Sequence, residues 1–168
     1  VDRTGRNVIA TLFEEKREVI PYSQIPQRLI DAFLAVEDSR FYQHFGVDPL
    51  GILRALWVNY RAGRVIQGGS TITVQLPRNI DPSLQKRKSE RSYNRKIVEA
   101  FAALQIEQHF SKDQILEFYL NHIEFSQLSH GVQAAARTYF NKSVTDLTIG
   151  ECAVLAALPK APTELNPF

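Results

Sequence analysis

Residues 26–46 read PQRLIDAFLAVEDSRFYQHFG, and this stretch decides the fold. Apolar side chains recur at intervals of three and four residues between Leu29 and Val36, which predicts an amphipathic helix that begins near Pro26. Glu37 closes that helix, ahead of a segment rich in aromatic residues. A glutamate in this position is a candidate catalytic group, because partial burial disfavours its charged form. Taken alone, such a residue more often has a structural role.

Helix caps and apolar periodicity predict further helices along the chain. Asp48 and Pro49 are typical of the N-cap and first position of a helix, and Gly63 is typical of its end. Capping-box patterns begin two later helices, at Ser111 and at Thr148. The sequence therefore predicts a predominantly α fold, with a short β-hairpin within residues 1–20. Helices are expected at about 26–37, 49–62, 90–110, 112–121, 132–140 and 149–158.

A glycine-rich segment, Gly-Gly-Ser-Thr at 68–71, precedes another apolar run. We expect Ser70 to cap the helix that follows. We also expect Pro77 to kink or stop that helix near Leu76, because proline removes an internal hydrogen bond. A helix N-terminus presents unpaired N–H groups to anions, so phosphate binding is a reasonable hypothesis for this segment. The pattern also describes any capped helix and is not specific by itself.

Basic residues gather between Arg78 and Lys96, where seven basic and two acidic side chains give a net charge of +5 in a chain that carries +2 overall. Such a run is usually a solvated helix face, and an anionic partner is the alternative. Glu99 lies one helical turn after Arg95 and Lys96, which places a carboxylate among cations. A surface ion pair between Arg95 and Glu99 is the simpler interpretation of this spacing.

The chain has 168 residues, 44% of them hydrophobic, which is enough for one core, so we expect a single domain over residues 1–168. It contains no apolar run of about 18 residues, and its ends at Val1 and Phe168 favour a domain excised from a longer, membrane-anchored protein. Cys152, the single cysteine, lies in an apolar run and is expected in the core. The four histidines show no metal-ligand spacing.

Five segments resemble, in order, the motifs of the glycosyltransferase domain of peptidoglycan polymerases. That domain occurs in class A penicillin-binding proteins and in monofunctional transglycosylases. The five segments together cover roughly residues 20–168. They are EDSRFYQHFG at 37–46, GGSTITVQ at 68–75, RKIVEA at 95–100, KDQILEFYLN at 112–121, and the closing segment at 155–167.

The resemblance implies a lysozyme-like helical domain that polymerises lipid II into β-1,4-linked glycan chains, inverts the donor anomeric carbon and releases undecaprenyl diphosphate. Glu37 would be the general base for the acceptor hydroxyl, which is a poor nucleophile near neutral pH. Glu99, the second catalytic carboxylate, would orient cations or hold a divalent ion, Mg or Mn, on the substrate diphosphate. Substrate and diphosphate binding is implied for Ser70, Thr71, Gln75, Arg78, Arg91, Arg95 and Lys96.

The resemblance also implies a loop after Glu37 and a membrane-facing lobe at about residues 47–69. The implied partners are lipid II, the growing glycan strand, the membrane surface and other cell-wall synthesis proteins, with no nucleic acid. The implied location is the outer face of the bacterial cytoplasmic membrane, the periplasmic side in a Gram-negative cell. The loop would be shaped by Asp38, Phe41, His44 and Gly46, and the lobe would present Leu53, Leu56 and Trp57.

Inversion requires the base and the leaving group to lie on opposite faces of the donor sugar, so the carboxyl groups of Glu37 and Glu99 should not be in contact. Several features depart from the family pattern: Val74 replaces a glutamine, Pro77 follows within the same helix, and Ser126 and Leu128 stand where glycine is common. The stretch from Asp81 to Lys88 is also longer than usual by about five residues. These departures leave open a degenerate module that binds lipid II without turnover. A lysozyme-like hydrolase is the other alternative, although it would have little use for the basic third motif.

Overall fold

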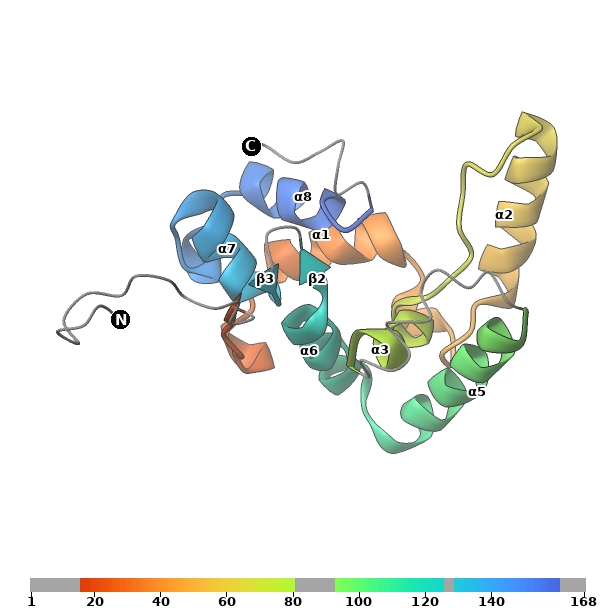
Figure 1. Ribbon diagram of the computed structural model, residues 1–168, viewed down its shortest axis with the longest axis horizontal. Coiled ribbons are helices and arrows are strands. Elements are labelled where there is room, and N and C mark those ends of the chain that lie inside the picture. The colour runs from red at the N-terminus through yellow and green to blue at the C-terminus, as the bar shows by residue number, and fades with distance from the viewer. Residues whose placement is uncertain (1–15, 81–92, 126–128, 161–168) are drawn as a thin grey trace, which may run out of the picture.

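The computed structural model describes residues 16–80, 93–125 and 129–160, and helices dominate it (Figure 1). The predicted predominantly α class is confirmed. The strands that the structure describes are two residues long each. The helices are α1 (Gln27–Glu37), α2 (Pro49–Ala62), α3 (Ile72–Ile80), α5 (Tyr93–His109), α6 (Lys112–His122), α7 (Val132–Phe140) and α8 (Ile149–Ala157), with 3-10 turns at Tyr22–Gln24, Phe41–Gln43 and Val144–Asp146.

Local sequence signals explain where several helices begin and end. Both predicted capping boxes are present, at Ser111 before α6 and at Thr148 before α8. Gly63 ends α2 in the left-handed conformation, with φ of 66°, which glycine adopts at little cost. Asp48 occupies the N-cap position of α2 without capping it through its side chain, because its carboxylate pairs instead with Arg40 at 3.6 Å.

Helix α3 corrects two sequence-based expectations. Thr71, not Ser70, caps it: the Thr71 hydroxyl accepts a hydrogen bond from the Val74 N–H at 3.1 Å. Thr71 directly precedes the first helical residue, and this is the position from which a side chain reaches the third N–H. The predicted stop near Leu76 is also wrong, since the helix continues through Pro77 to Ile80, while the alternative, a kink there, stays a prediction. We attribute this to packing of α3 against α5 and α6, which overrides the local cost of proline.

The hydrophobic core holds α1 in place along most of its length. Helix α1 packs against α8, and α3 packs against both α5 and α6 (Figure 1). Phe33 of α1 meets the ring of Tyr119 from α6 edge-on at 6.4 Å, and Cys152 is buried in the same core. Each fully buried aliphatic or aromatic side chain contributes about 1.5–3 kcal/mol by leaving water. The largest fully buried side chains include Leu29, Ile30, Phe33, Ile72, Leu76, Ile115, Leu116 and Tyr119.

A small sheet joins the start of the described chain to its C-terminal half. Strand β1 (Lys16–Arg17) runs parallel to β3 (Ser129–His130), which pairs antiparallel with β2 (Glu124–Phe125). Asn121 strengthens this junction, since its amide donates to and accepts from the backbone of Ile20 at 2.8 and 3.0 Å. Residues 1–15 lie outside the described residues, so the N-terminal hairpin stays a prediction.

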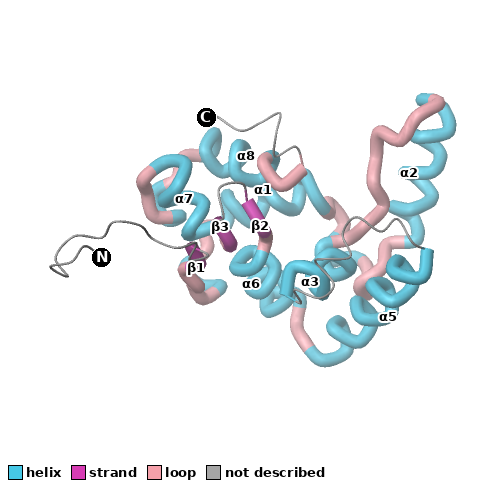
Figure 2. Tube along the Cα trace, viewed as in Figure 1, coloured by secondary structure: helices cyan, strands magenta, loops and turns pink. Residues whose placement is uncertain are grey.

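Helix α2 stands apart from the rest of the molecule, and the segment after it runs back alongside it (Figure 2). Asn59 fastens that return segment: its side-chain oxygen accepts from the N–H groups of Ile66 and Gln67 at 2.8 and 2.9 Å. Leu53, Leu56 and Trp57 are 62%, 61% and 62% exposed. Within residues 16–80, 93–125 and 129–160, no helix combines the length and apolar character needed to cross a membrane.

Candidate active site

A pocket of about 220 Å³ opens at the C-terminal end of α1, where Glu37 lies. Four parts of the chain form it: the end of α1 and the turn after it, the start of α2, the segment that leads into α3 together with the first turn of α3, and Lys160, the third residue after α8. The lining residues are Ala35, Val36, Glu37, Asp38, Ser39, Arg40, Asp48, Gly51, Arg54, Gln67, Gly68, Gly69, Ser70, Thr71, Gln75 and Lys160.

Glu37 is half-buried, and a neighbouring amide holds its carboxylate. The Gln75 side chain, on α3, donates a hydrogen bond from Nε2 to Glu37 Oε2 at 3.0 Å. This contact joins the first and second predicted motifs, whose residues lie 38 positions apart in the chain. The hydrogen bond engages Oε2, one of the two carboxylate oxygens, at the wall of the pocket.

Asp38, the next residue, is buried and ties the turn after α1 to the start of α3. Its carboxylate accepts the Ile72 N–H at 3.1 Å and contacts His44 Nε2 at 3.0 Å. His44 Nδ1 accepts the Gly46 N–H at 3.2 Å, so the ring proton belongs on Nε2, facing Asp38. Gly46 has φ of 99°, and a Cβ there would approach the Ala103 carbonyl oxygen to 2.9 Å, so the loop requires glycine at this point.

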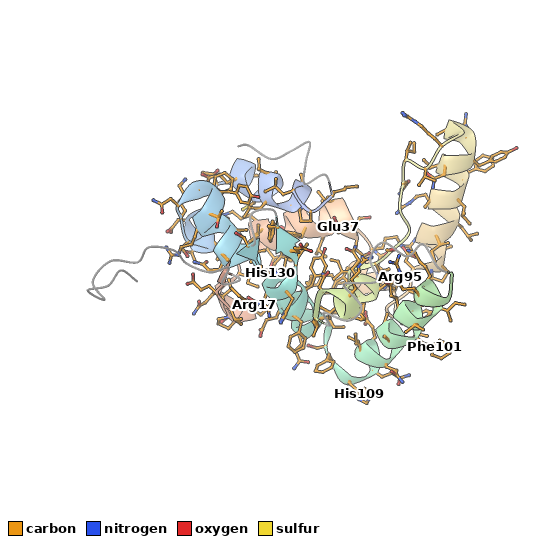
Figure 3. The ribbon with its side chains drawn as sticks, in the orientation of Figure 1. Arg17, Glu37, Arg95, Phe101, His109 and His130 are labelled. Atoms are coloured by element: carbon orange, nitrogen blue, oxygen red, sulfur yellow. The ribbon has the colours of Figure 1, made fainter. Side chains whose placement is uncertain are left out.

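Glu99, the second predicted carboxylate, lies on α5. Its carboxylate pairs with Arg95 Nε at 3.4 Å, as the four-residue spacing indicated, but it is only 3% exposed and so is not the surface pair that spacing alone suggested. The predicted lack of contact between the carboxyl groups of Glu37 and Glu99 stays a prediction. Figure 3 shows Glu37 at the end of α1 and Arg95 on α5.

Of the other predicted cations, the structure describes Lys96 on α5 and Arg78 on α3. Lys96 is exposed and donates from Nζ to Ser70 Oγ at 3.0 Å, which links the third motif to the glycine-rich segment. Arg78, on α3, is half-buried near Tyr119. Burial raises the pKa of the Tyr119 hydroxyl well above its usual 10.0, the negative charge of Glu37 adds to this rise, and the positive charge of Arg78 opposes it. Arg91, Ser126 and Leu128 lie outside the described residues.

Sequence reasoning missed two cations that line the pocket, Arg54 on α2 and Lys160 after α8. Both are exposed, and among the described residues neither side chain has an ion pair or hydrogen bond. Arg54 sits between Leu53 and Ala55 in a helix interpreted only for its apolar face, although its charge could have marked the opposite, polar face. Lys160 lies within the fifth motif, and no sequence signal placed it near Glu37.

The carboxylates of this region suit a metal ion that substrate phosphates also coordinate better than a metal ion coordinated by protein side chains alone. Among residues 16–80, 93–125 and 129–160, no group of three or more histidine, cysteine, aspartate or glutamate side chains could hold a metal ion. Glu99 supplies one buried carboxylate beside Arg95. Mg²⁺ commonly binds through one or two carboxylates together with substrate phosphates, so this donor set fits such an ion when a diphosphate is bound.

Comparison with known proteins agrees with the site geometry. Residues 5–168 match the family model described as "Transglycosylase". The chain is 48% identical to penicillin-binding protein 1A of Aquifex aeolicus over 99% of its length, and 50% identical to penicillin-binding protein 1A of Escherichia coli over 96%. It is 45% identical to penicillin-binding protein 1F of Bacillus subtilis over its full length.

These matches take in 22%, 18% and 23% of the respective relatives, so the chain spans about a fifth of the length of the curated relatives it matches. The family model covers nearly all of this chain, and the described residues include most of the five motifs on which the resemblance rests. The resemblance is confirmed, and this chain belongs to the transglycosylase family, as a peptidoglycan transglycosylase domain.

Proposed function

We propose that this chain is a peptidoglycan glycosyltransferase that polymerises lipid II into β-1,4-linked glycan, inverts the donor anomeric carbon and releases undecaprenyl diphosphate. The observation that carries the proposal is the environment of Glu37. This carboxylate lies in a pocket and is oriented by Gln75. Family membership supports the same reaction class.

Glu37 acts as general base in this proposal. Its Oε1 takes the proton of the acceptor 4-hydroxyl as the oxygen attacks the donor C1, and the bond from C1 to the diphosphate breaks. The Gln75 amide fixes the carboxylate by its other oxygen, so the proton acceptor points in a defined direction. Positioned proton transfer of this kind accelerates a reaction by about 10²–10⁴-fold.

The leaving diphosphate gains negative charge as the bond breaks, and cations aimed at it stabilise that change. Lys96, which donates a hydrogen bond to Ser70, supports this role. Arg78 lies on α3, and Arg95 lies on α5, the helix that also carries Lys96. Arg54 and Lys160 supply further positive charge inside the pocket itself. The positive character of these surroundings argues against a hydrolase that cleaves between neutral sugars.

A divalent cation, Mg or Mn, completes the proposal. Phosphate oxygens of the substrate would hold it together with Glu99, and it would neutralise charge on the diphosphate. The residues around it orient the substrate, and Arg95 keeps Glu99 in place. Chelation with EDTA should abolish polymer formation, and added Mg²⁺ or Mn²⁺ should restore it.

Incubation with lipid-linked precursor and Mg²⁺, followed by separation of products by size, tests the reaction. We expect polymer from the wild type and a loss of about 10²-fold or more in Glu37→Gln. Glu18→Gln, at a side chain that is 52% exposed, serves as control and should keep full activity. Shortening of pre-formed glycan would identify a hydrolase, and binding of the precursor without any product would identify a degenerate module.

The proposed location is the outer face of the bacterial cytoplasmic membrane, with lipid II, the glycan strand and other cell-wall synthesis proteins as partners. The exposed apolar side chains of α2 support contact with the membrane, since Leu53, Leu56 and Trp57 leave a large apolar area in water. The pocket opens at the base of the same helix, at Gly51 and Arg54. A lipid-linked substrate could therefore reach Glu37 while its tail remains in the bilayer.

A further inference from the structure

We propose that Lys112 and Glu107, which lie outside the pocket, are positioning residues that hold Glu37 in place through a closed ring of contacts. The inference rests on the proposed role of Glu37 as general base. The ring leaves Glu37 through Gln75, crosses α3, α5 and the start of α6, and returns through the loop that follows α1. Hydrogen bonds and an ion pair form most of its links, and the backbone joins Gln75 to Thr73 and Asp38 to Glu37.

The first half of the ring runs from Glu37 to Glu107. Gln75 Nε2 donates to Glu37 Oε2 at 3.0 Å, and Thr73 lies two residues earlier in the same helix. The fully buried Thr73 hydroxyl donates to Glu107 Oε1, on α5, at 2.7 Å. Glu107 therefore fixes the first turn of α3, the turn from which Gln75 projects.

Lys112, the first residue of α6, joins the two halves. Its Nζ contacts Glu107 Oε1 at 2.7 Å and donates to the His44 carbonyl oxygen, also at 2.7 Å. The same ammonium group lies 4.4 Å from the centre of the Phe41 ring, within cation–π range. The ammonium group of Lys112 thus contacts both α5 and two residues of the loop after Glu37, Phe41 and His44.

The second half of the ring returns from His44 to Glu37. His44 Nε2 contacts both carboxylate oxygens of Asp38, at 3.1 and 3.0 Å. Asp38 follows Glu37 directly in the chain and also binds the Ile72 N–H at the start of α3. The base is therefore fixed twice, once through its own backbone and once through the amide that orients its carboxylate.

Partial burial strengthens the ion pair between Lys112 and Glu107. The side chains of Lys112 and Glu107 are 20% and 10% exposed, so water screens their interaction less than that of a surface pair. Loss of Lys112 would release the His44 carbonyl and leave a poorly solvated carboxylate at Glu107. Both ends of the ring would loosen, and a misplacement of about 1 Å at a reacting group can cost about 10²-fold in rate.

The chain offers a matched control pair at the other end of the molecule. Lys142 and Glu151 are also joined at 2.7 Å, and neither lines the pocket. The test pair is the double variant Glu107→Gln/Lys112→Met, which removes both charges together and so avoids an unpaired buried carboxylate. The control is Glu151→Gln/Lys142→Met. The single variant Lys112→Arg keeps a positive charge at position 112, and it tests whether that charge is enough to hold the ring.

Steady-state kinetics with lipid-linked precursor, measured well below the melting temperature, give the first readout. We expect kcat of the test pair to fall about 10- to 100-fold with KM within about twofold of wild type. The control pair should keep wild-type kcat, and the single variant Lys112→Arg should keep most of the wild-type kcat. If the test and control pairs lose Tm but keep equal kcat, Lys112 and Glu107 serve stability alone and the inference is wrong.

Hydrogen–deuterium exchange gives a second readout that needs no activity. Amides of residues 38–46 and 71–75 should exchange faster in the test pair than in wild type, while α7 and α8 stay unchanged. Unchanged exchange in both segments would overturn the ring as a positioning device. A wild type that binds precursor and makes no polymer would count against the proposed function instead, and exchange would still decide whether the ring holds Glu37.

Discussion

Asp38 places one negative charge where the turn after α1 meets the start of α3. Its carboxylate accepts the Ile72 N–H and contacts His44, and the side chain is buried. Hydrogen bonds to a charged group are worth about 1.5–3 kcal/mol each. We therefore expect Asp38→Asn to lower the free energy of unfolding by about 2 kcal/mol in urea denaturation. Asp31→Asn, an exposed change on the same helix, is the control; equal losses in both variants would contradict this role.

Tyr119 carries a hydroxyl that has no hydrogen-bond partner among the described residues, although its ring is fully buried. Removal of such a group relieves the cost of its desolvation, so we expect Tyr119→Phe to stabilise the fold by about 1 kcal/mol at pH 7. Burial raises the pKa of this hydroxyl well above 10.0. The unfolded chain therefore ionises first, and stability should fall as pH rises above about 10.

Urea unfolding of wild type and Tyr119→Phe between pH 7 and pH 11 measures both effects. The alkaline loss of stability should be shallower in the variant, because phenylalanine has no proton to release. A destabilised variant at pH 7 would mean that the hydroxyl has a partner in solution.

Single residues show where sequence reasoning reached its limit. The spacing around Glu99 correctly predicted its pair with Arg95, because residues four apart in a helix are neighbours. Burial of that pair could not be predicted, since it depends on which face α5 turns toward α3. Lys160 was missed for the same kind of reason: its approach to Glu37 depends on how α8 packs against α1.

At the level of elements, the capping box of α8 predicts a specific acid sensitivity. The hydrogen bond from Lys142 is the main cause that lowers the pKa of Glu151 from 4.5 to about 2, and the Thr148 N–H adds to it. A carboxylate with a lowered pKa stabilises the fold above its unfolded value and loses that contribution as pH falls. We expect Glu151→Gln to flatten the loss of stability between about pH 4.5 and pH 2.

Circular dichroism during urea unfolding at several pH values checks this expectation. The exposed Glu18, paired with Arg137 at 3.5 Å, supplies the matched change Glu18→Gln. An acid profile of Glu151→Gln that overlays the wild-type profile would show that the box does not act through its charge.

Most helices could be predicted from local signals, because caps and apolar periodicity act within a few residues of each other. The α7 bounds of Val132–Phe140 match the expected range, and α1 differs by one residue. The course of α3 could not be predicted in this way, since Pro77 opposes the helix locally and only α5 and α6 keep it intact. The parallel pairing of β1 with β3 is likewise long-range, between residues more than 110 positions apart.

On the scale of the whole molecule, α2 presents an apolar face that the core does not cover. We expect serine at Leu53, Leu56 and Trp57 together to weaken binding to anionic vesicles in a sedimentation assay, because apolar area drives such binding. Ile149→Ser, at an exposed apolar residue of α8, should leave binding unchanged. Equal binding by the triple variant would remove the membrane from the proposal.

Motifs that lie far apart along the chain come together in the folded molecule. The first, second and fifth motifs all contribute residues to one pocket, and a contact from the third reaches the second. The family resemblance implied that these motifs share a site, whereas the ring through Lys112 could not be predicted, because Glu107 belongs to none of the five motifs.

The single cysteine offers a practical use of the packing between α1 and α8. Cys152 is fully buried, and burial raises the pKa of its thiol, so a disulfide reagent can label it only when the core opens. A ligand that binds the folded chain at Glu37 should slow this labelling in proportion to its occupancy. The native thiol would then report the affinity of a non-reacting substrate analogue, with no added probe and no turnover.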